Sequence, residues 1–167
     1  RRIHDTYGEK LNICTVIGFP LGYSTTASKV QEARDAVADG ASEIDMVINI
    51  ADVKNGDYQK VEEEIRAIRG ACQGKILKVI IETCYLTEEE KIAMCHAVTN
   101  AKADYIKTST GFGTAGAQLT DIALFKANIG PDVKIKAAGG IRTRQAMEDF
   151  LAAGCDRIGS SSALDIL

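Results

Sequence analysis

The chain has 167 residues, a length typical of one domain that can bury a substantial core. Its 20 basic and 23 acidic residues give a net charge of -3, and because no long basic cluster occurs, we expect no nucleic-acid partner. No stretch approaches ~20 consecutive apolar residues, and the amino end has no signal-like apolar core, so we expect a cytoplasmic protein without a membrane partner.

Cysteines and histidines give no metal-binding pattern. The five cysteines, at positions 14, 72, 84, 95 and 155, form no CxxC pair. Their odd number argues against a disulfide framework or a structural zinc site, so we expect small side chains in the core. His4 lies in a polar leader, and His96 is expected on one side of a surface helix, so no metal is predicted.

Six runs rich in apolar and β-branched residues follow one another along the chain. They cover residues 12–19, 43–49, 78–83, 105–110, 134–138 and 157–160. Their first residues lie 31, 35, 27, 29 and 23 positions apart, which leaves room for a helix after each run. Parallel neighbouring strands need such a crossover, so the pattern predicts alternating strands and helices in an α/β fold.

The segments between the runs carry residues typical of helix ends. The clearest is Thr87-Glu88-Glu89-Glu90, a capping box with acids at the positive end of a helix that continues to about residue 101. Thr120 and Thr143 are the expected N-caps of the last two full helices, and Gly154 the end of the second of these. Two further helices are predicted, from the Ser24-Thr25 cap to residue 39 and from Asp57 to about residue 71.

This alternation fits either a doubly wound open sheet or a (βα)8 barrel, and six strands fit the open sheet better by count. Polar residues near the carboxyl ends of several strands favour the barrel, in which catalytic groups converge on one mouth. Gly139-Gly140 and Gly159-Ser160-Ser161-Ser162 follow the last two strands, where barrels frequently bind phosphate and dinucleotide-binding folds do not. We therefore expect residues 1–167 to form a single partial TIM-barrel domain of about six βα units, strands three to eight, that lacks two units at its amino end.

Three of the predicted interior strands carry a charge, at Asp45, Lys107 and Lys136. Burial lowers the pKa of an ammonium group, and a second ammonium nearby lowers it further, so Lys107 beside Lys136 would be a free amine that attacks carbonyls. Asp45 would balance the charge and relay protons. Two structural alternatives stay open: Lys107 extends its head into water at the strand end, or Asp45 and the lysines form an ion pair that only fixes packing.

The chain resembles deoxyribose-phosphate aldolases, class I aldolases that form a Schiff base on a (βα)8 barrel, from about Ile13 to Ser162. The resemblance rests on six stretches in the right order: residues 15–22 with Lys29, then 43–50, 78–83, 104–112, 136–142 and 157–161.

The resemblance implies an enzyme that reversibly cleaves 2-deoxy-D-ribose 5-phosphate to acetaldehyde and D-glyceraldehyde 3-phosphate, without a cofactor. Lys107 would form the Schiff base, Lys136 would perturb its pKa, and Asp45 would take part in proton transfer. The residues expected around the substrate phosphate are Gly111, Gly139, Gly140, Arg142, Gly159, Ser161 and Ser162.

Some features of the family are absent from this sequence. Its first two strands and its carboxyl tail have no counterpart, and Lys102 stands where a turn glycine with positive φ is usual. A barrel without two strands would expose two edges, so we expect a homo-oligomer. Alternatives are a catalytically inactive barrel fragment that only binds phosphate or self-assembles, and an aldolase for keto-acid or ketose phosphates. Glu82, at a strand end, is expected as a solvated charge on the barrel rim, with a supporting contact to the site residues as the alternative.

Overall fold

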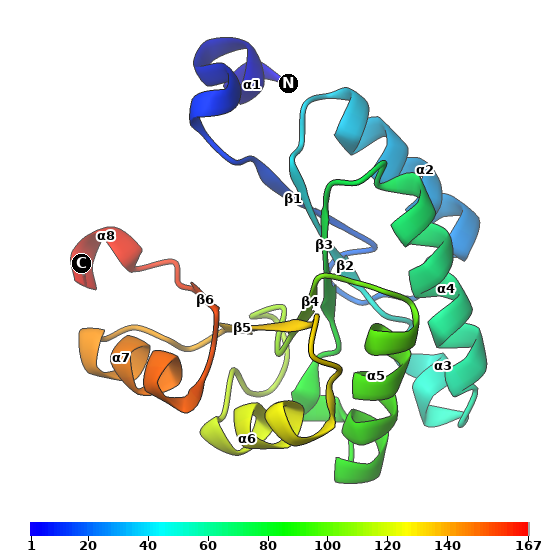
Figure 1. Cartoon of the computed structure of the whole chain (residues 1–167), viewed down its shortest axis with the longest axis vertical. Coiled ribbons are helices and arrows are strands. Elements are labelled where there is room, and N and C mark those ends of the chain that lie inside the picture. The colour runs from blue at the N-terminus through cyan, green and yellow to red at the C-terminus, as the bar shows by residue number, and fades with distance from the viewer. Residues whose placement is uncertain (167) are drawn as a thin grey trace.

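Six parallel strands form one curved sheet in the order β1-β2-β3-β4-β5-β6 (Figure 1). The computed structural model describes residues 1–166. The strands are β1 (Cys14–Ile17), β2 (Glu43–Val47), β3 (Ile76–Ile80), β4 (Tyr105–Lys107), β5 (Lys134–Ala138) and β6 (Arg157–Gly159). The helices are α1 (Arg2–Tyr7), α2 (Thr26–Ala38), α3 (Ile50–Lys54), α4 (Tyr58–Ala71), α5 (Glu88–Asn100), α6 (Leu119–Asn128), α7 (Arg144–Ala153) and α8 (Ala163–Ile166).

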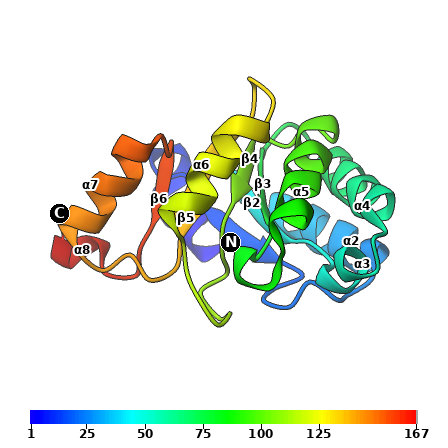
Figure 2. The ribbon, with the colours of Figure 1, turned by 90° about the horizontal axis from the view of Figure 1, so that it is seen from below.

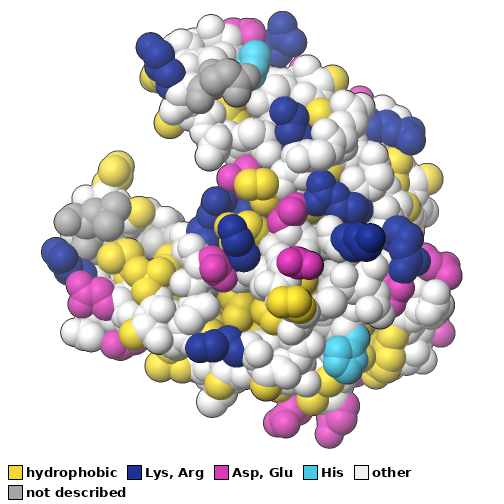
Figure 3. All heavy atoms as spheres, in the orientation of Figure 1, with side chains coloured by type: hydrophobic (Ala, Val, Ile, Leu, Met, Phe, Trp, Pro, Cys, Tyr) yellow, Lys and Arg dark blue, Asp and Glu magenta, His cyan; other side chains and the backbone are white. Residues whose placement is uncertain are grey.

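The sheet is a half-barrel. Strand order follows chain order, and the helices from α2 to α7 line the outer, convex side of the arc (Figures 1 and 2). A doubly wound sheet would instead reverse its strand order and carry helices on both faces. The surface is hollowed between the β1 end and the β6 end, where the arc stays open (Figure 3). The predicted α/β fold is therefore confirmed, as an arc of six parallel strands.

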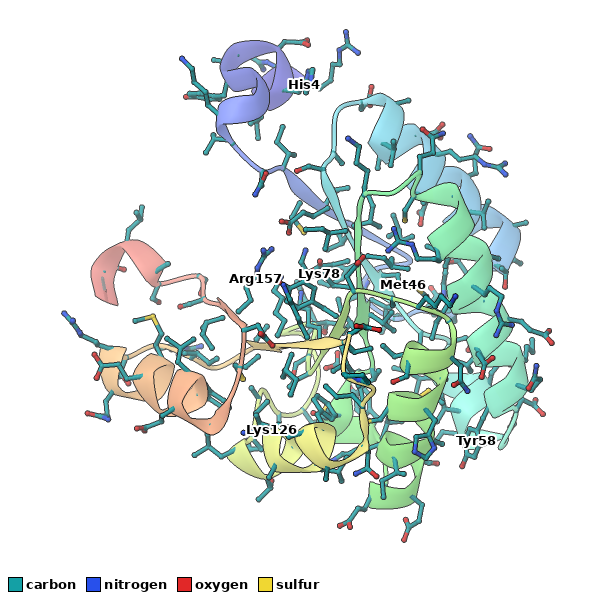
Figure 4. All side chains as sticks on the ribbon, viewed as in Figure 1. His4, Met46, Tyr58, Lys78, Lys126 and Arg157 are labelled. Atoms are coloured by element: carbon teal, nitrogen blue, oxygen red, sulfur yellow. The ribbon has the colours of Figure 1, made fainter. Side chains whose placement is uncertain are left out.

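Alternation along the strands separates an apolar face from a polar one. Ile44 and Met46 on β2 and Val79 on β3 belong to the core that packs between sheet and helices. Asp45 lies between Ile44 and Met46, so its side chain points to the opposite face of the sheet, because successive strand residues alternate between faces. It pairs in register with Lys78 on β3. Figure 4 shows Met46 on the helix side and Lys78 on the inner side of the arc. The concave face therefore collects the charged side chains.

Helix ends follow the predicted caps in most places. The Thr25 hydroxyl accepts a hydrogen bond from Ser28 N and the Thr143 hydroxyl accepts one from Ala146 N, and the Thr87 capping box is complete. Gly154, with φ 110°, ends α7 in the left-handed conformation that glycine adopts readily.

The predicted N-cap at Thr120 is wrong. Helix α6 begins at Leu119, and the carbonyl of Gln118 already accepts hydrogen bonds from Asp121 N and Ile122 N. Thr120 therefore lies inside the first turn. The short helix α3, which we did not predict, begins after Asn49, whose side chain accepts from the backbone at positions 51 and 52.

The expectation that all cysteines pack in the core is wrong for two of them. Cys72, Cys95 and Cys155 are buried, whereas Cys84 is half-buried and Cys14 is exposed. Cys14 lies on β1 at the edge of the sheet and pairs in register with Glu43, so it faces the concave side. Among residues 1–166, no helix is long and apolar enough to span a membrane.

Candidate active site

Lys107, Asp45 and Lys136 meet on the concave side of the sheet. The Nζ atoms of Lys107 and Lys136 each donate a hydrogen bond of 2.8 Å to the same oxygen of Asp45, Oδ2. Lys107 ends β4, Lys136 lies beside it in register on β5, and Asp45 comes from β2. Lys107 is only 7% exposed, so the alternative in which it extends its head into water is wrong.

Burial and neighbouring charges perturb two of these groups. Burial lowers the pKa of Lys107 below its usual value; the Asp45 carboxylate opposes this shift, and the Lys136 ammonium adds to it. Burial alone would raise the pKa of Asp45, but the ammonium groups of Lys107 and Lys136 outweigh it and hold that pKa well below its usual range. Asp45 is thus a fixed anion between a poised amine and a second cation.

A third lysine, Lys78, contacts the same aspartate from the other side. Its Nζ atom donates to Asp45 Oδ1 at 2.8 Å and lies 2.6 Å from Glu43 Oε2 and 3.4 Å from Cys14 Sγ. Lys78 is fully buried; burial would lower its pKa, but the carboxylates of Asp45 and Glu43 raise it. Lys78 therefore stays charged and keeps Oδ1 occupied, which leaves Oδ2 to Lys107 and Lys136.

Sequence reasoning missed Lys78 because the strand that carries it was placed two residues too late. The predicted run began at Lys78, where a charge at a strand end is unremarkable, but β3 begins at Ile76. Lys78 is the middle residue of that strand. A lysine among Ile76, Leu77 and Val79 was the signal that could have identified it.

Glu43, which contacts Lys78, also forms an ion pair with Arg157. Arg157 lies on β6 and Glu43 on β2, and the guanidinium of Arg157 lies 5.2 Å from the ring centre of Tyr105. Arg157 and Lys78 both lie on the inner side of the arc in Figure 4. The pair thus connects β6 to β2 across the concave face, where a cation over an aromatic ring is favourable.

A cavity of about 370 Å³ opens directly above Lys107 and Lys136. Besides these lysines, its walls contain six of the seven residues expected around a phosphate, Gly111, Gly139, Gly140, Arg142, Gly159 and Ser161. The seventh, Ser162, is not among the lining residues; its backbone N–H donates to Ser160 Oγ at 3.1 Å. Ser160, which belongs to the predicted phosphate-binding segment but not to those seven residues, lines the cavity and donates from its hydroxyl to Ile141 O.

The glycines of this cavity adopt backbone conformations that other residues rarely reach. Gly139 and Gly140 have φ values of 88° and 78°, in the region that favours glycine. A Cβ atom at Gly116 would lie 2.2 Å from Gly139 O, so the neighbouring loop also needs glycine to approach this closely. Backbone without side chains at the mouth of a cavity allows N–H groups to reach an anion.

Two other residues noted in the sequence are also placed by the structure. Lys102 has a φ of 58°, so it does adopt the positive φ for which glycine is usual. Glu82 is only 2% exposed and accepts hydrogen bonds from the backbone N–H and the hydroxyl of Thr110. The expectation of a solvated rim charge at Glu82 is wrong, because its side chain reaches over the end of the neighbouring strand instead of into water.

Lys29, part of the first matching stretch, lies outside the cavity. It is fully buried on α2, and its Nζ atom donates to Glu64 Oε2 at 2.9 Å and to Val47 O at 2.8 Å. This pair joins α2 to α4 and to the end of β2. Among the side chains that the structure describes, those of residues 1–8 and 10–165, no group of three or more His, Cys, Asp or Glu residues is placed to hold a metal ion.

Comparisons with known proteins agree on one family. Residues 1–164 match the model of the DeoC/LacD family aldolases. The chain is 68% identical over 166 residues to a deoxyribose-phosphate aldolase of Clostridium botulinum, covering 99% of the chain and 75% of the relative, and 58% identical over 158 residues to one of Clostridioides difficile, covering 95% and 72%.

Solved structures give the same result. An aldolase structure superposes with a TM-score of 0.93 at 42% identity, covering 99% of this chain and 75% of its own. A deoxyribose phosphate aldolase from Aeropyrum pernix, described as a unique tetrameric structure, superposes with a TM-score of 0.89 at 30% identity, covering 99% and 69%.

Proposed function

The chain belongs to the DeoC/LacD aldolase family, and from that premise we propose that it reversibly cleaves 2-deoxy-D-ribose 5-phosphate to acetaldehyde and D-glyceraldehyde 3-phosphate through a Schiff base on Lys107. One observation carries the assignment of the nucleophile. Lys107 is a buried lysine with a lowered pKa, and it lies at the base of a cavity whose walls contain glycines and Arg142.

The chemistry needs only an amine, a proton relay and a carbonyl. The free amine of Lys107 adds to the C1 aldehyde, and loss of water leaves a protonated imine. The C3 hydroxyl then gives up its proton, the C2–C3 bond breaks, and its electron pair moves toward the imine, which becomes an enamine. D-glyceraldehyde 3-phosphate departs with C3 as its aldehyde carbon. Protonation of the enamine at C2 and hydrolysis release acetaldehyde and restore the amine.

Asp45 and Lys136 divide the supporting roles. Lys136 adds to the effect of burial in lowering the pKa of Lys107, and Asp45 holds both nitrogens at 2.8 Å from one oxygen. Because the pKa of Asp45 is lowered, this carboxylate is a poor proton donor by itself. We therefore assign it the task of orienting water and the Lys136 ammonium, which together move the proton to and from the substrate.

The phosphate would lie against the glycines and hydroxyls of the cavity wall. Gly111, Gly139, Gly140, Arg142, Gly159 and Ser161 line the cavity, and Ser162 stays a prediction. The cations of Arg142 and Lys136 favour an anion there, and glycine backbone allows close approach.

Several finer assignments complete the proposal. Strands β1 to β6 correspond to strands three to eight of a (βα)8 barrel, and residues 1–167 form one partial domain. The tetrameric relative from Aeropyrum pernix supports self-association, so we propose a homo-oligomer. Function in the cytoplasm, without a nucleic-acid partner, also stays a prediction.

Trapping the imine tests the function. Acetaldehyde with sodium cyanoborohydride is expected to ethylate Lys107, and peptide mapping by mass spectrometry locates the label. Lys107→Met should abolish labelling, while Lys134→Met, on an exposed lysine outside the cavity, should not. Labelling at another lysine would contradict the assignment. Binding of inorganic phosphate with no trapping and no cleavage would favour the inactive fragment. Equally fast cleavage of 2-deoxyribose with and without the 5-phosphate would contradict the proposed substrate.

A further inference from the structure

Glu82 has an unusual backbone for its residue type. It lies two residues beyond the end of β3, with φ 51° and ψ 67°, in the left-handed region. A residue with a Cβ atom pays conformational energy there, and such strain persists only where surrounding contacts over-determine it, commonly at functional sites. The contacts of this side chain therefore need an explanation.

Both oxygens of the Glu82 carboxylate bind one residue of the loop that follows β4. Oε1 accepts a hydrogen bond of 3.1 Å from Thr110 N, and Oε2 accepts one from the Thr110 hydroxyl. The same threonine oxygen accepts from Phe112 N at 3.0 Å. In the described part of the chain, no Lys, Arg or His lies within ion-pair distance of Glu82. Its burial is thus compensated through this loop.

Residues 110–113 of this loop pack closely against the Glu82 carboxylate. A Cβ atom at Gly113 would lie 3.1 Å from Glu82 Cδ and 2.6 Å from Cys84 Sγ, so the chain passes here only because position 113 has no side chain. Hydrogen bonds from Thr110 on one side and close backbone packing at Gly113 on the other fix residues 110–113 relative to the end of β3.

Two of those residues, Thr110 and Gly111, line the cavity above Lys107, and Glu82 does not. Gly139 also lines the cavity, and a Cβ atom there would lie 3.7 Å from Gly111 Cα, so the two glycine segments are close neighbours. Both Glu82 oxygens accept hydrogen bonds from Thr110, and Glu82 itself is not a lining residue, so its negative charge lies outside the cavity lining.

We propose that Glu82 is a positioning residue that sets selectivity for the 5-phosphate by holding the Thr110–Gly111 turn against the Gly139 segment. The inference rests on the proposed function, since it assigns phosphate to this cavity. Glu82 does not touch the reacting carbons, so it should affect binding of the phosphate and leave imine chemistry at Lys107 unchanged.

The test compares substrates with and without the phosphate. Glu82→Ala is expected to raise the KM for 2-deoxyribose 5-phosphate and the Kd for inorganic phosphate about tenfold, as for loss of a hydrogen bond to a charged group, while kcat/KM for unphosphorylated 2-deoxyribose changes by less than about twofold. Glu82→Gln keeps an acceptor for Thr110 N and should show a smaller effect. Thr110→Ala should reproduce part of the loss and add little to Glu82→Ala.

Controls separate this inference from the fold and from the proposed function. Glu63→Gln removes one exposed negative charge on α4 and should behave as the unsubstituted chain, and thermal melts check that each variant is folded. An equal loss for both substrates, or an unchanged Kd for phosphate in folded Glu82→Ala and Thr110→Ala, would overturn the role of Glu82. Acetaldehyde trapping at Lys107 needs no phosphate, so its failure in the unsubstituted chain would instead refute the proposed function.

Discussion

Replacing Lys136 by methionine is expected to slow imine formation at Lys107 by about a hundredfold at neutral pH. The ammonium nitrogens of both lysines lie 2.8 Å from one oxygen of Asp45, so they are at most about 5.6 Å apart. At an effective dielectric constant of about 20, two unit charges at that distance repel by about 3 kcal/mol, which corresponds to roughly a hundredfold change in equilibrium.

The sign of the pH dependence follows from the same contact. The Lys136 charge helps to lower the pKa of Lys107, and the Asp45 carboxylate opposes it. Without Lys136, the aspartate holds the Lys107 proton more strongly, and less free amine is present at a given pH. The trapping rate of Lys136→Met should therefore fall at neutral pH and recover as the pH rises.

The assay is the initial rate of acetaldehyde trapping by cyanoborohydride, followed by intact mass from about pH 6 to about pH 10, a range chosen to contain perturbed lysine pKa values. Lys134→Met is the matched control, because Lys134 lies on the same strand and face as Lys136 but extends over the Tyr105 ring, with its Nζ 5.9 Å from the ring centre. An unchanged pH profile in Lys136→Met, or one displaced to lower pH, would refute the electrostatic role.

Three further predictions concern stability, each measured by urea unfolding. Lys29→Met should lower the free energy of unfolding by about 3–5 kcal/mol, because it leaves the buried Glu64 carboxylate without its partner. A decrease below about 1 kcal/mol would contradict a buried ion pair. Adding Glu64→Leu to Lys29→Met should restore most of the lost stability. The pKa of Asp45 is lowered in the fold, so its ionised form stabilises the protein above the unfolded-state pKa of about 4, and this stabilisation is lost as the pH falls further. The difference in unfolding free energy between the unsubstituted chain and Asp45→Asn should therefore narrow below about pH 4. A difference that widens in acid would contradict this prediction. Thr143→Ala should cost about 1 kcal/mol through loss of a helix cap, whereas Thr120→Ala should cost less than about 0.5 kcal/mol; equal losses would mean that Thr120 also acts as a cap.

Local patterns in the sequence were sufficient for the alternation of strands and helices. The run at 134–138 coincides with β5, and the caps at Thr25, Thr87 and Thr143 lie where the sequence placed them. Such signals work because an N-cap hydrogen bond or a buried strand involves residues within a few positions of one another. The motifs also identified Asp45, Lys107 and Lys136 as interior charges.

What the sequence could not supply is the pairing between distant segments. That both lysines bind the same oxygen of Asp45, that Lys78 holds the other oxygen, and that Arg157 reaches Glu43 are consequences of strand register. The left-handed Glu82 is a further case, since its reach to Thr110 depends on how β3 and β4 end side by side. The sequence alone thus determined the parallel α/β fold and identified three charged residues that lie within its strands. Only the tertiary structure decided which of them meet, because contacts across strands depend on register and curvature that no short segment contains.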